Sequence, residues 1–253
     1  MPTILLTNDD GVDAPGLHAA RAALEALGEV IVVAPRSERS ASSHALSLRR
    51  PLQLERRDPG VHAVDGTPVD CVFVACEVVL GGRRPDLLVS GINAGGNLGD
   101  DILYSGTVAA AVEGALRDIP AMAVSLVGRH DLDYDAAARF VTTLGRQILR
   151  EGMAPRTVLN VNVPRHLALP ARYRLTQVGQ HRYRDVIEHL EPGADGQRLQ
   201  IAGTWAGYED IEGSDCAAVG QGLISVTPLQ ARFGPGEPPR SLQERSLDGF
   251  AQV

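Results

Sequence analysis

The stretch from residue 3 to residue 35, TILLTNDDGVDAPGLHAARAALEALGEVIVVAP, decides the fold that the sequence predicts. Its ends, TILLT (3–7) and VIVVA (30–34), are short aliphatic runs typical of buried strands. The apolar residues between them recur at helical spacing: Leu17, Ala20, Leu24 and Leu27. A strand, a helix and a second strand in this order predict a βαβ unit, whose two strands are parallel.

The same alternation continues along the chain. Further strands are predicted at 86–90, 121–127, 157–163 and 222–229, and helices at 67–80, 107–118 and 134–150. This order predicts an α/β protein, a Rossmann-like three-layer sandwich with a mainly parallel sheet.

Beyond about residue 177 the sequence changes character. Turn residues recur there at short intervals without a helical period, which predicts an extended β-hairpin arm at 178–218. We therefore expect an α/β core of residues 1–177 and 219–231, the hairpin arm, and a C-terminal tail at 232–253.

Composition narrows the possible functions. The 253 residues are 44% hydrophobic and 22% charged, as in an ordinary globular protein. A net charge of −7 and only 4% aromatic residues argue against a nucleic acid polymer as partner. All 24 basic residues are Arg, so enzymes that need a Schiff-base or Walker lysine are excluded.

The cysteines and the apolar runs indicate the compartment. The three cysteines, Cys71, Cys76 and Cys216, lack CxxC spacing and predict neither a disulfide framework nor a zinc site. No apolar run approaches the roughly 18 residues that a membrane span needs. We expect a cytoplasmic protein with no membrane partner.

Polar loops follow three of the predicted strands, at 8–11, 35–44 and 91–107. In a parallel sheet these loops open at the same edge, where ligands bind. Asn8, Asp9 and Asp10 could simply form a turn that caps the next helix. Three such groups exceed what one helix start needs, however, and adjacent carboxylates repel unless a cation neutralises them.

An all-oxygen metal site is the sharper hypothesis for this edge. Its ligands would be Asp9, Asp10, the Ser40 hydroxyl and the Asn93 amide oxygen. Such a set suits Mg²⁺ or Mn²⁺ better than Zn²⁺, which prefers His and Cys. We expect one divalent cation per subunit.

The loop at 91–107 fits neither the dinucleotide-binding pattern nor the Walker pattern, and a flexible loop is the alternative. Ser105, Gly106 and Thr107 directly precede a predicted helix, with Thr107 as the expected N-cap. A helix N-terminus with a small Gly106 can also bind a phosphate. Asn97 is a candidate ligand for the substrate or for metal-bound water, or else a brace for the loop.

Other polar residues are weaker candidates. Asp100 and Asp101 form a second acidic pair, for which a solvated or supporting role is expected. His18 is expected at the surface of the first helix, and His44 is a minor catalytic candidate near the second loop.

Six blocks of sequence resemble one known family. They are ILLTNDDGVDAPGL, VVAPRSERSASS, GTPVDCV, VSGINAGGNLGDDILYSGTVAAAVEG, LNVNVP and GSDCAAVGQGLISVTPL, which span residues 4 to 229 in order. The chain thus resembles the SurE (survival protein E) family of 5'/3'-nucleotidases. Two features depart from the family pattern: Ala41 follows Ser40 where the family often has Gly, and the tail beyond residue 232 matches no family pattern.

The resemblance implies a cytoplasmic, metal-dependent phosphatase that hydrolyses nucleoside 5'- and 3'-monophosphates, and in some members short polyphosphate. It implies that Asp9, Asp10, Ser40 and Asn93 bind Mg²⁺ or Mn²⁺. It further implies that Asn97 and the turn of Ser105, Gly106 and Thr107 lie near the substrate phosphate. Members form homodimers or homotetramers by exchanging C-terminal segments, which would give the arm a purpose.

A mechanism follows from this set of residues. Asp9 would be a firm metal ligand, and Asp10 would orient or deprotonate a water that attacks phosphorus directly, because no nucleophile with an adjacent His base is evident. Two other classes stay open. A receiver-like signalling domain also has an acidic pair but needs a lysine, and a non-catalytic metal and nucleotide sensor would bind without turnover.

Overall fold

The computed structural model describes residues 1–128, 130–167, 170–193 and 196–232. Within them a nine-stranded sheet has the order β3-β4-β2-β1-β5-β6-β7-β11-β8. The six strands from β4 to β7 in that order are parallel to their neighbours, whereas β3 and β11 run antiparallel to β4 and β7. The expected mainly parallel sheet is therefore confirmed.

The strands of this sheet are β1 (Thr3–Thr7), β2 (Glu29–Pro35), β3 (Leu54–Asp58), β4 (Val61–Val64), β5 (Leu87–Ala94), β6 (Ala121–Val127), β7 (Thr157–Pro164), β8 (Tyr173–Leu175) and β11 (Ile224–Gln230). The helices are α1 (Pro15–Leu24), α2 (Pro68–Val74), α3 (Gly106–Leu116), α4 (Asp135–Glu151) and α5 (Asp215–Gly220), with a π-helical turn η1 (Ala75–Val79) and a 3₁₀ turn η2 (Gly99–Leu103).

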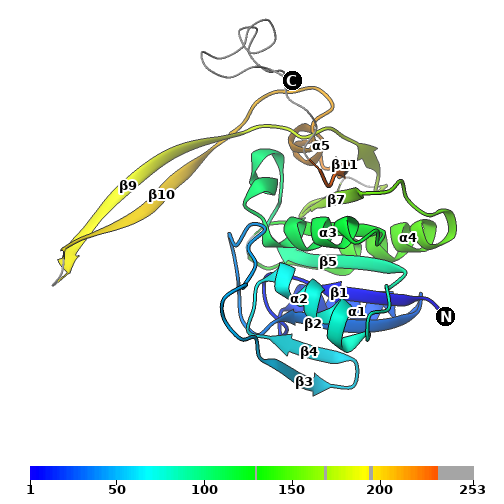
Figure 1. Ribbon diagram of the computed structural model, residues 1–253. Coiled ribbons are helices and arrows are strands. Elements are labelled where there is room, and N and C mark those ends of the chain that lie inside the picture. Colours follow the sequence, from blue (N-terminus) through cyan, green and yellow to red (C-terminus); the bar gives the residue numbers. More distant parts are fainter. Residues whose placement is uncertain (129, 168–169, 194–195, 233–253) are drawn as a thin grey trace, which may run out of the picture.

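Helices cover both faces of the sheet, which makes three layers (Figure 1). Alternate residues of β1 show the two faces: Ile4 and Leu6 pack in one apolar cluster, and Leu5 packs in the other. The first cluster includes the buried residues of α1 and α4, and the second includes those of α2 and α3. The predicted sandwich is confirmed, and its two helical layers cover both faces of β1.

Some elements escaped prediction. Strand β3 is exposed along its whole length and carries charged residues, so it lacks the apolar run that marks a buried strand. The short elements β4, β8 and α5 were also missed, and β11 was predicted without its antiparallel direction. The helix predicted at 67–80 is α-helical only to Val74 and continues as the π-helical turn η1.

A two-stranded arm leaves the body of the molecule. Strands β9 (His181–Gly193) and β10 (Gly196–Tyr208) pair with each other and with no strand of the large sheet, and Figure 1 shows them extending away from it. The predicted hairpin arm is present. The domain boundaries at 177, 218 and 231 stay predictions, and the tail from residue 233 onward lies outside the described residues.

Among the helices in the described ranges, none combines the length and the apolar character that crossing a membrane requires.

Candidate active site

The acidic turn directly follows β1, and the Asn8 side chain forms two hydrogen bonds within it. Asn8 is fully buried, donates from Nδ2 to the Gly11 carbonyl at 2.9 Å and accepts from the Gly11 N–H at 3.2 Å. Gly11 has φ +104°, and a Cβ there would meet the backbone of Ser37 at 3.2 Å. Asn8 therefore shapes the turn, which leaves the two aspartates as the chemical groups.

Asp9 is a buried carboxylate that is 6% exposed. It accepts hydrogen bonds from the Thr107 hydroxyl and, at 3.1 Å, from the Thr107 N–H at the start of α3. Burial raises the pKa of Asp9 to about 6, with a further upward contribution from the Asp10 charge and an opposing one from the Thr107 hydrogen bonds. The folded protein thus holds this carboxylate in an environment that disfavours its charge.

Asp10 lies beside Asp9 and is half-buried. Its Oδ2 accepts the Ala94 N–H at the end of β5, at 3.1 Å. Burial raises the pKa of Asp10, and the nearby Glu38 charge raises it further. Neither Asp9 nor Asp10 forms an ion pair with an Arg or His within the part of the chain that the structure describes.

The two neutral residues of the predicted metal set come from two neighbouring segments. Ser40 lies in the loop after β2, whereas Asn93 lies within β5, which continues to Ala94 rather than ending at residue 90 as predicted. Asn93 donates from Nδ2 to the Gly95 carbonyl at 2.8 Å, and this bond turns its Oδ1 the other way. Ser40 is exposed and donates to Glu38 Oε1 at 2.6 Å, so its lone pairs remain available. Both can still offer an oxygen.

Helix α3 begins against Asp9. The N-cap is Ser105, whose hydroxyl accepts the Val108 N–H at 3.1 Å, so the expectation that Thr107 is the N-cap is wrong. Thr107 lies in the first turn, where its N–H and hydroxyl hold Asp9. A Cβ at Gly106 would lie 2.9 Å from Asp9 Cβ, so this glycine permits the close approach of helix and acidic turn.

Asn97 is a brace in this structure. It is buried, donates from Nδ2 to the Ser125 hydroxyl at 2.7 Å, and its backbone N–H donates to Asn162 Oδ1 at 2.8 Å. Its carbonyl also accepts from the side chains of Asn160 and Asn162. The loop-bracing alternative therefore describes most of its contacts, and substrate binding by Asn97 stays a prediction.

Three residues near the site were missed from the sequence. The Ser42 hydroxyl is buried, has no hydrogen-bond partner among the described residues, and lies 2.7 Å from where a Gly106 Cβ would be. Arg39 Nε is likewise buried without a partner in the described ranges, and the Arg39 N–H donates to the Asp9 carbonyl at 2.8 Å. The pKa of Tyr134 is raised by burial and by the Asp10 charge. For Ser42, the serines at 40, 42 and 43 were a signal in the sequence.

The weaker candidates are placed as follows. His18 is exposed on α1, as expected. Asp101 pairs with His181 at the start of β9, with Nδ1 and Oδ2 2.7 Å apart, which agrees with a supporting role. His44 Nε2 lies 3.1 Å from Glu113 Oε2 on α3 and so contacts the helix rather than the acidic turn.

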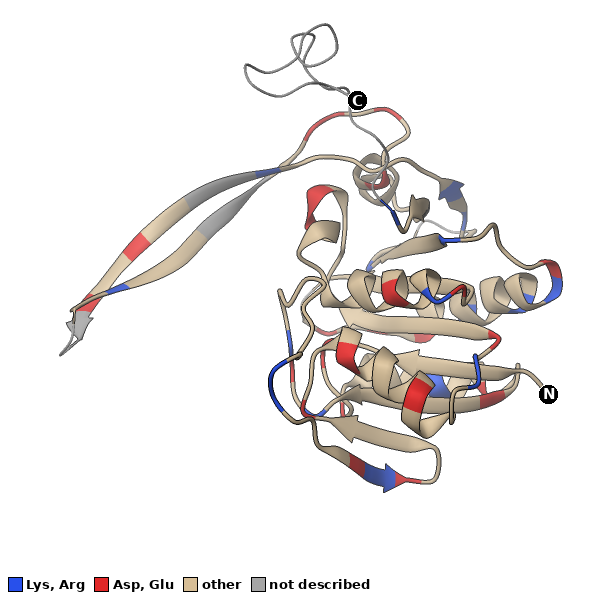
Figure 2. Cartoon of the chain, viewed as in Figure 1, with Lys and Arg blue, Asp and Glu red and all other residues tan. Residues whose placement is uncertain are grey.

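The donor set at the turn is rich in oxygen and poor in other metal ligands. Within the described residues, no three His, Cys, Asp or Glu side chains come together as a metal cluster. The candidate site therefore depends on two carboxylates, with a hydroxyl and an amide completing it. Figure 2 shows basic residues along the loop that follows β2, which would favour an anion beside the carboxylates.

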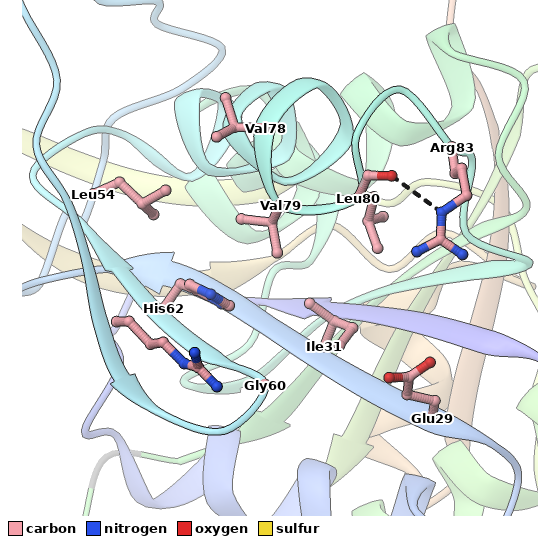
Figure 3. A pocket seen from close by; sticks show the side chains of 10 residues that line it. Glu29, Ile31, Leu54, Gly60, His62, Val78, Val79, Leu80 and Arg83 are labelled. Carbon is pink, nitrogen blue, oxygen red and sulfur yellow. Dashed lines mark hydrogen bonds between the residues drawn. The ribbon is translucent and has the colours of Figure 1, made fainter.

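A hollow of about 420 Å³ lies elsewhere in the molecule (Figure 3). It is bounded by Ile31 on β2, His62 on β4 and the residues Val78, Val79 and Leu80 at the end of η1. None of the predicted site residues lines it. The acidic turn is instead part of an open edge formed by three loops.

Comparison with known proteins agrees with this architecture. A solved structure described as the SurE protein from Aquifex aeolicus superposes with a TM-score of 0.82 at 39% identity, covering 92% of this chain and 95% of that one. A protein from Anaeromyxobacter sp. (strain Fw109-5) named 5'-nucleotidase SurE is 51% identical over 89% of each chain. One of the same name from Geotalea uraniireducens (strain Rf4) is 50% identical over 89% of this chain and 92% of its own.

The sequence model of the family described as Survival protein SurE matches residues 4–185, which include every residue of the candidate site. The match covers more than half of the chain, and the relatives match nearly all of it. On this sequence and structural similarity, the chain belongs to the SurE family.

Proposed function

We propose that this chain is a divalent-metal-dependent nucleotidase that hydrolyses nucleoside 5'-monophosphates, and also 3'-monophosphates, to nucleoside and phosphate. The relatives named 5'-nucleotidase SurE support the reaction class. Short polyphosphate as a further substrate, and a cytoplasmic location, stay predictions from the family resemblance.

The observation that carries this proposal is the pair of carboxylates at the end of β1. Asp9 is buried with a pKa of about 6, Asp10 is half-buried with a raised pKa, and Glu38 adds a third negative charge nearby. Holding these charges together without a cation costs free energy. A dication bound between them would remove that cost.

The residues present fit a hard divalent cation such as Mg²⁺ or Mn²⁺. Asp9 and Asp10 would hold it, with the Asn93 amide oxygen and the Ser40 hydroxyl as further ligands. The Ser42 hydroxyl nearby, which has no hydrogen-bond partner within the described part of the chain, is a further polar group that a ligand could satisfy. The chemistry that such a cation supplies is Lewis-acid stabilisation of a phosphoryl oxygen and a lowered pKa for a water.

The chain's own groups divide the remaining tasks. Thr107 fixes both oxygens of Asp9, which suits Asp9 to a constant position. Asp10 is fixed through Oδ2 alone, so its Oδ1 is the group we assign to orienting or deprotonating the attacking water.

Contact with the phosphate falls to the start of α3 and to the loop after β2. The N–H groups of Thr107 and Val108 already donate within the protein, so we assign the phosphate to the Gly106 N–H. Arg39, whose buried Nε has no hydrogen-bond partner among the described residues, is a candidate for added positive charge. This departs from the simpler expectation that the whole helix terminus is free.

Assay of free phosphate from AMP with Mn²⁺ tests the proposal. The wild-type protein should release phosphate, EDTA should abolish the release, and Asp9→Asn or Asp10→Asn should lower turnover at least about a hundredfold. Asp13→Asn, which neutralises an exposed carboxylate next to the same turn, is the matched control and should keep activity. Retained activity in both site variants at saturating Mn²⁺ would refute the residue assignment.

The same assay separates enzyme from sensor and defines the substrate range. AMP binding, seen by calorimetry with Mn²⁺ present and without phosphate release, would identify a non-catalytic sensor. Parallel assays with 3'-AMP and tripolyphosphate decide the two extensions that come from the family resemblance.

We also propose that the arm joins copies of this chain into a homodimer or homotetramer. Ile187 pairs with Ile201 across β9 and β10, and these side chains are 51% and 86% exposed. Leu199 lies on the same hairpin face as Ile201 and is 55% exposed. An apolar hairpin face standing in solvent is the kind of surface that a second copy covers.

Light scattering of variants tests this assembly. Ile201→Arg should shift the protein toward monomer, because it places a charge on the apolar face of the arm. Gln200→Arg is the control, since residue 200 is also exposed but faces the opposite side of the hairpin. An unchanged mass for Ile201→Arg would exclude this face as the contact.

A further inference from the structure

The buried carboxylate of Asp215 connects three segments that are far apart in the sequence. Asp215 begins α5 and is 0% exposed. Its Oδ2 accepts the Gly99 N–H at 3.0 Å, and its Oδ1 accepts the N–H groups of Gly179 and Cys216, each at 2.8 Å. Three donors satisfy a carboxylate that would otherwise be costly to bury.

Each segment held by Asp215 has a distinct place in the molecule. Gly99 begins η2, in the loop that carries Asn97 and leads to Ser105 and the start of α3. Gly179 lies two residues before β9, at the root of the arm, and Figure 1 shows the arm leaving the body beside α5. The carboxylate thus joins the loop of the candidate active site to the base of the arm.

The backbone segments at this junction pack so closely that neither Gly99 nor Gly179 has room for a side chain. A Cβ on Gly179 would lie 2.7 Å from Asp215 Oδ1 and 2.8 Å from Cys216 Sγ. Gly99 has φ +53°, and a Cβ there would lie 3.1 Å from the backbone of Gly179. Neither segment can shift far without the other.

A second contact ties the same two segments together. Asp101 in η2 pairs with His181, the first residue of β9, with Oδ2 and Nδ1 2.7 Å apart. The Asp101 carbonyl also accepts the N–H groups of Tyr104 and Ser105, which set the turn into α3. These contacts form a continuous path from the arm root to the N-cap of the helix that holds Asp9.

We propose that Asp215 is a positioning residue for the phosphatase reaction, whose carboxylate locks the loop at 95–105 to the root of the arm. The placement of the arm then sets the geometry of the active-site loop, and a change in how the arm is held alters turnover. This inference rests on the proposed active site, but the junction itself can be tested apart from activity.

Asp215→Asn removes one charge and places an amide donor against backbone N–H groups, at nearly constant volume. Because a small misplacement of reacting groups can cost about a hundredfold in rate, we expect kcat to fall roughly 10- to 100-fold with a KM change below about threefold. Gly179→Ala keeps Asp215, but the added Cβ would lie 2.7 Å from Asp215 Oδ1 and would displace the carboxylate from the Gly179 N–H. This variant should lower kcat in the same way. Ser214→Ala is the matched control, because it removes the N-cap hydrogen bond of α5 but keeps the Asp215 carboxylate.

Hydrogen exchange measured by mass spectrometry on the full-length variants gives a readout that does not depend on catalysis. In Asp215→Asn and Gly179→Ala, exchange should rise at 96–104 and at 178–182, whereas Ser214→Ala should raise it only around 215–220. If Asp215→Asn folds poorly, the Gly179→Ala variant carries the test.

Different outcomes test the positioning role of Asp215, the junction itself and the proposed function. Wild-type turnover in a folded Asp215→Asn protein, or an equal loss in Ser214→Ala, would overturn the positioning role. Unchanged exchange at 96–104 would overturn the junction. If the wild-type protein releases no phosphate, the proposed function fails, and the exchange result still decides whether the loop and the arm are coupled.

Discussion

Replacing Asp9 with Asn in the metal-free protein removes a negative charge that burial disfavours in the folded state. The carboxylate is buried, and its pKa is about 6 in the folded protein against 3.8 for an unperturbed Asp. The folded state therefore keeps this proton to a higher pH than the unfolded chain does. As the pH rises between about 4 and 6, the stability of the metal-free wild-type protein falls on this account, and above both values the loss is constant.

The magnitude follows from the two pKa values. Their difference corresponds to about 3 kcal/mol of lost stability at neutral pH and above. Between about pH 4.5 and about pH 8 the change amounts to roughly 2 kcal/mol, because the unfolded Asp is already mostly ionised at the lower pH. Asp9→Asn also loses one Thr107 hydrogen bond, which costs about 1 to 2 kcal/mol at every pH.

Urea unfolding in EDTA at the two pH values measures the effect. The free energy of unfolding of Asp9→Asn minus that of wild type should be about 2 kcal/mol larger at about pH 8 than at about pH 4.5. The variant is thus expected to gain stability relative to wild type as the pH rises. Taking the difference between pH values cancels the hydrogen-bond loss. Asp13→Asn, an exposed neutralisation next to the same turn, should show a difference near zero. If the Asp9→Asn difference is also near zero, the reasoning about a strained buried charge is wrong.

Saturating Mn²⁺ should raise the melting temperature of wild type but not of Asp9→Asn, as differential scanning calorimetry will show. Thr107→Val removes the hydroxyl that bonds to Asp9, so the free energy of unfolding of the metal-free protein, measured by urea in EDTA, should fall by about 1 to 2 kcal/mol. Gly106→Ala forces a Cβ to within 2.9 Å of Asp9, and phosphate release should fall at least about tenfold at unchanged oligomeric mass. Burial raises the pKa of Glu113, but hydrogen bonds from His44 and Arg117 outweigh this effect and leave the pKa lowered. His44→Gln should therefore lower the free energy of unfolding by about 1 kcal/mol at pH values above the unfolded Glu pKa. This loss should become smaller as acid protonates Glu113.

Much of the fold could be predicted from the sequence because buried parallel strands and amphipathic helices are local patterns. The strands at 3–7, 121–127 and 157–163 were predicted to within one residue of their observed ends. Strand β3 could not be predicted this way, because every residue of it is exposed and it lacks the alternation of apolar and polar residues that marks a half-buried strand. The direction of β11 was equally hidden, because an apolar strand has the same composition in either direction.

For the candidate site, the order of residues along the chain was enough to predict which chemical groups stand at the sheet edge. Polar residues after Thr7 and Ser90, where the predicted strands end, were expected to meet there, because parallel strands end at one edge. The absence of Lys excluded several chemistries. Three facts became visible only in the folded protein. Ser105 rather than Thr107 caps α3, and Thr107 donates hydrogen bonds to Asp9. Asn97 mainly stabilises its own loop. Only the tertiary structure joined Asp215 to a loop 116 residues away. The reason is physical: periodicity reports which side chains are buried, whereas hydrogen-bond partners and pKa shifts depend on which distant backbone groups packing brings within about 3 Å.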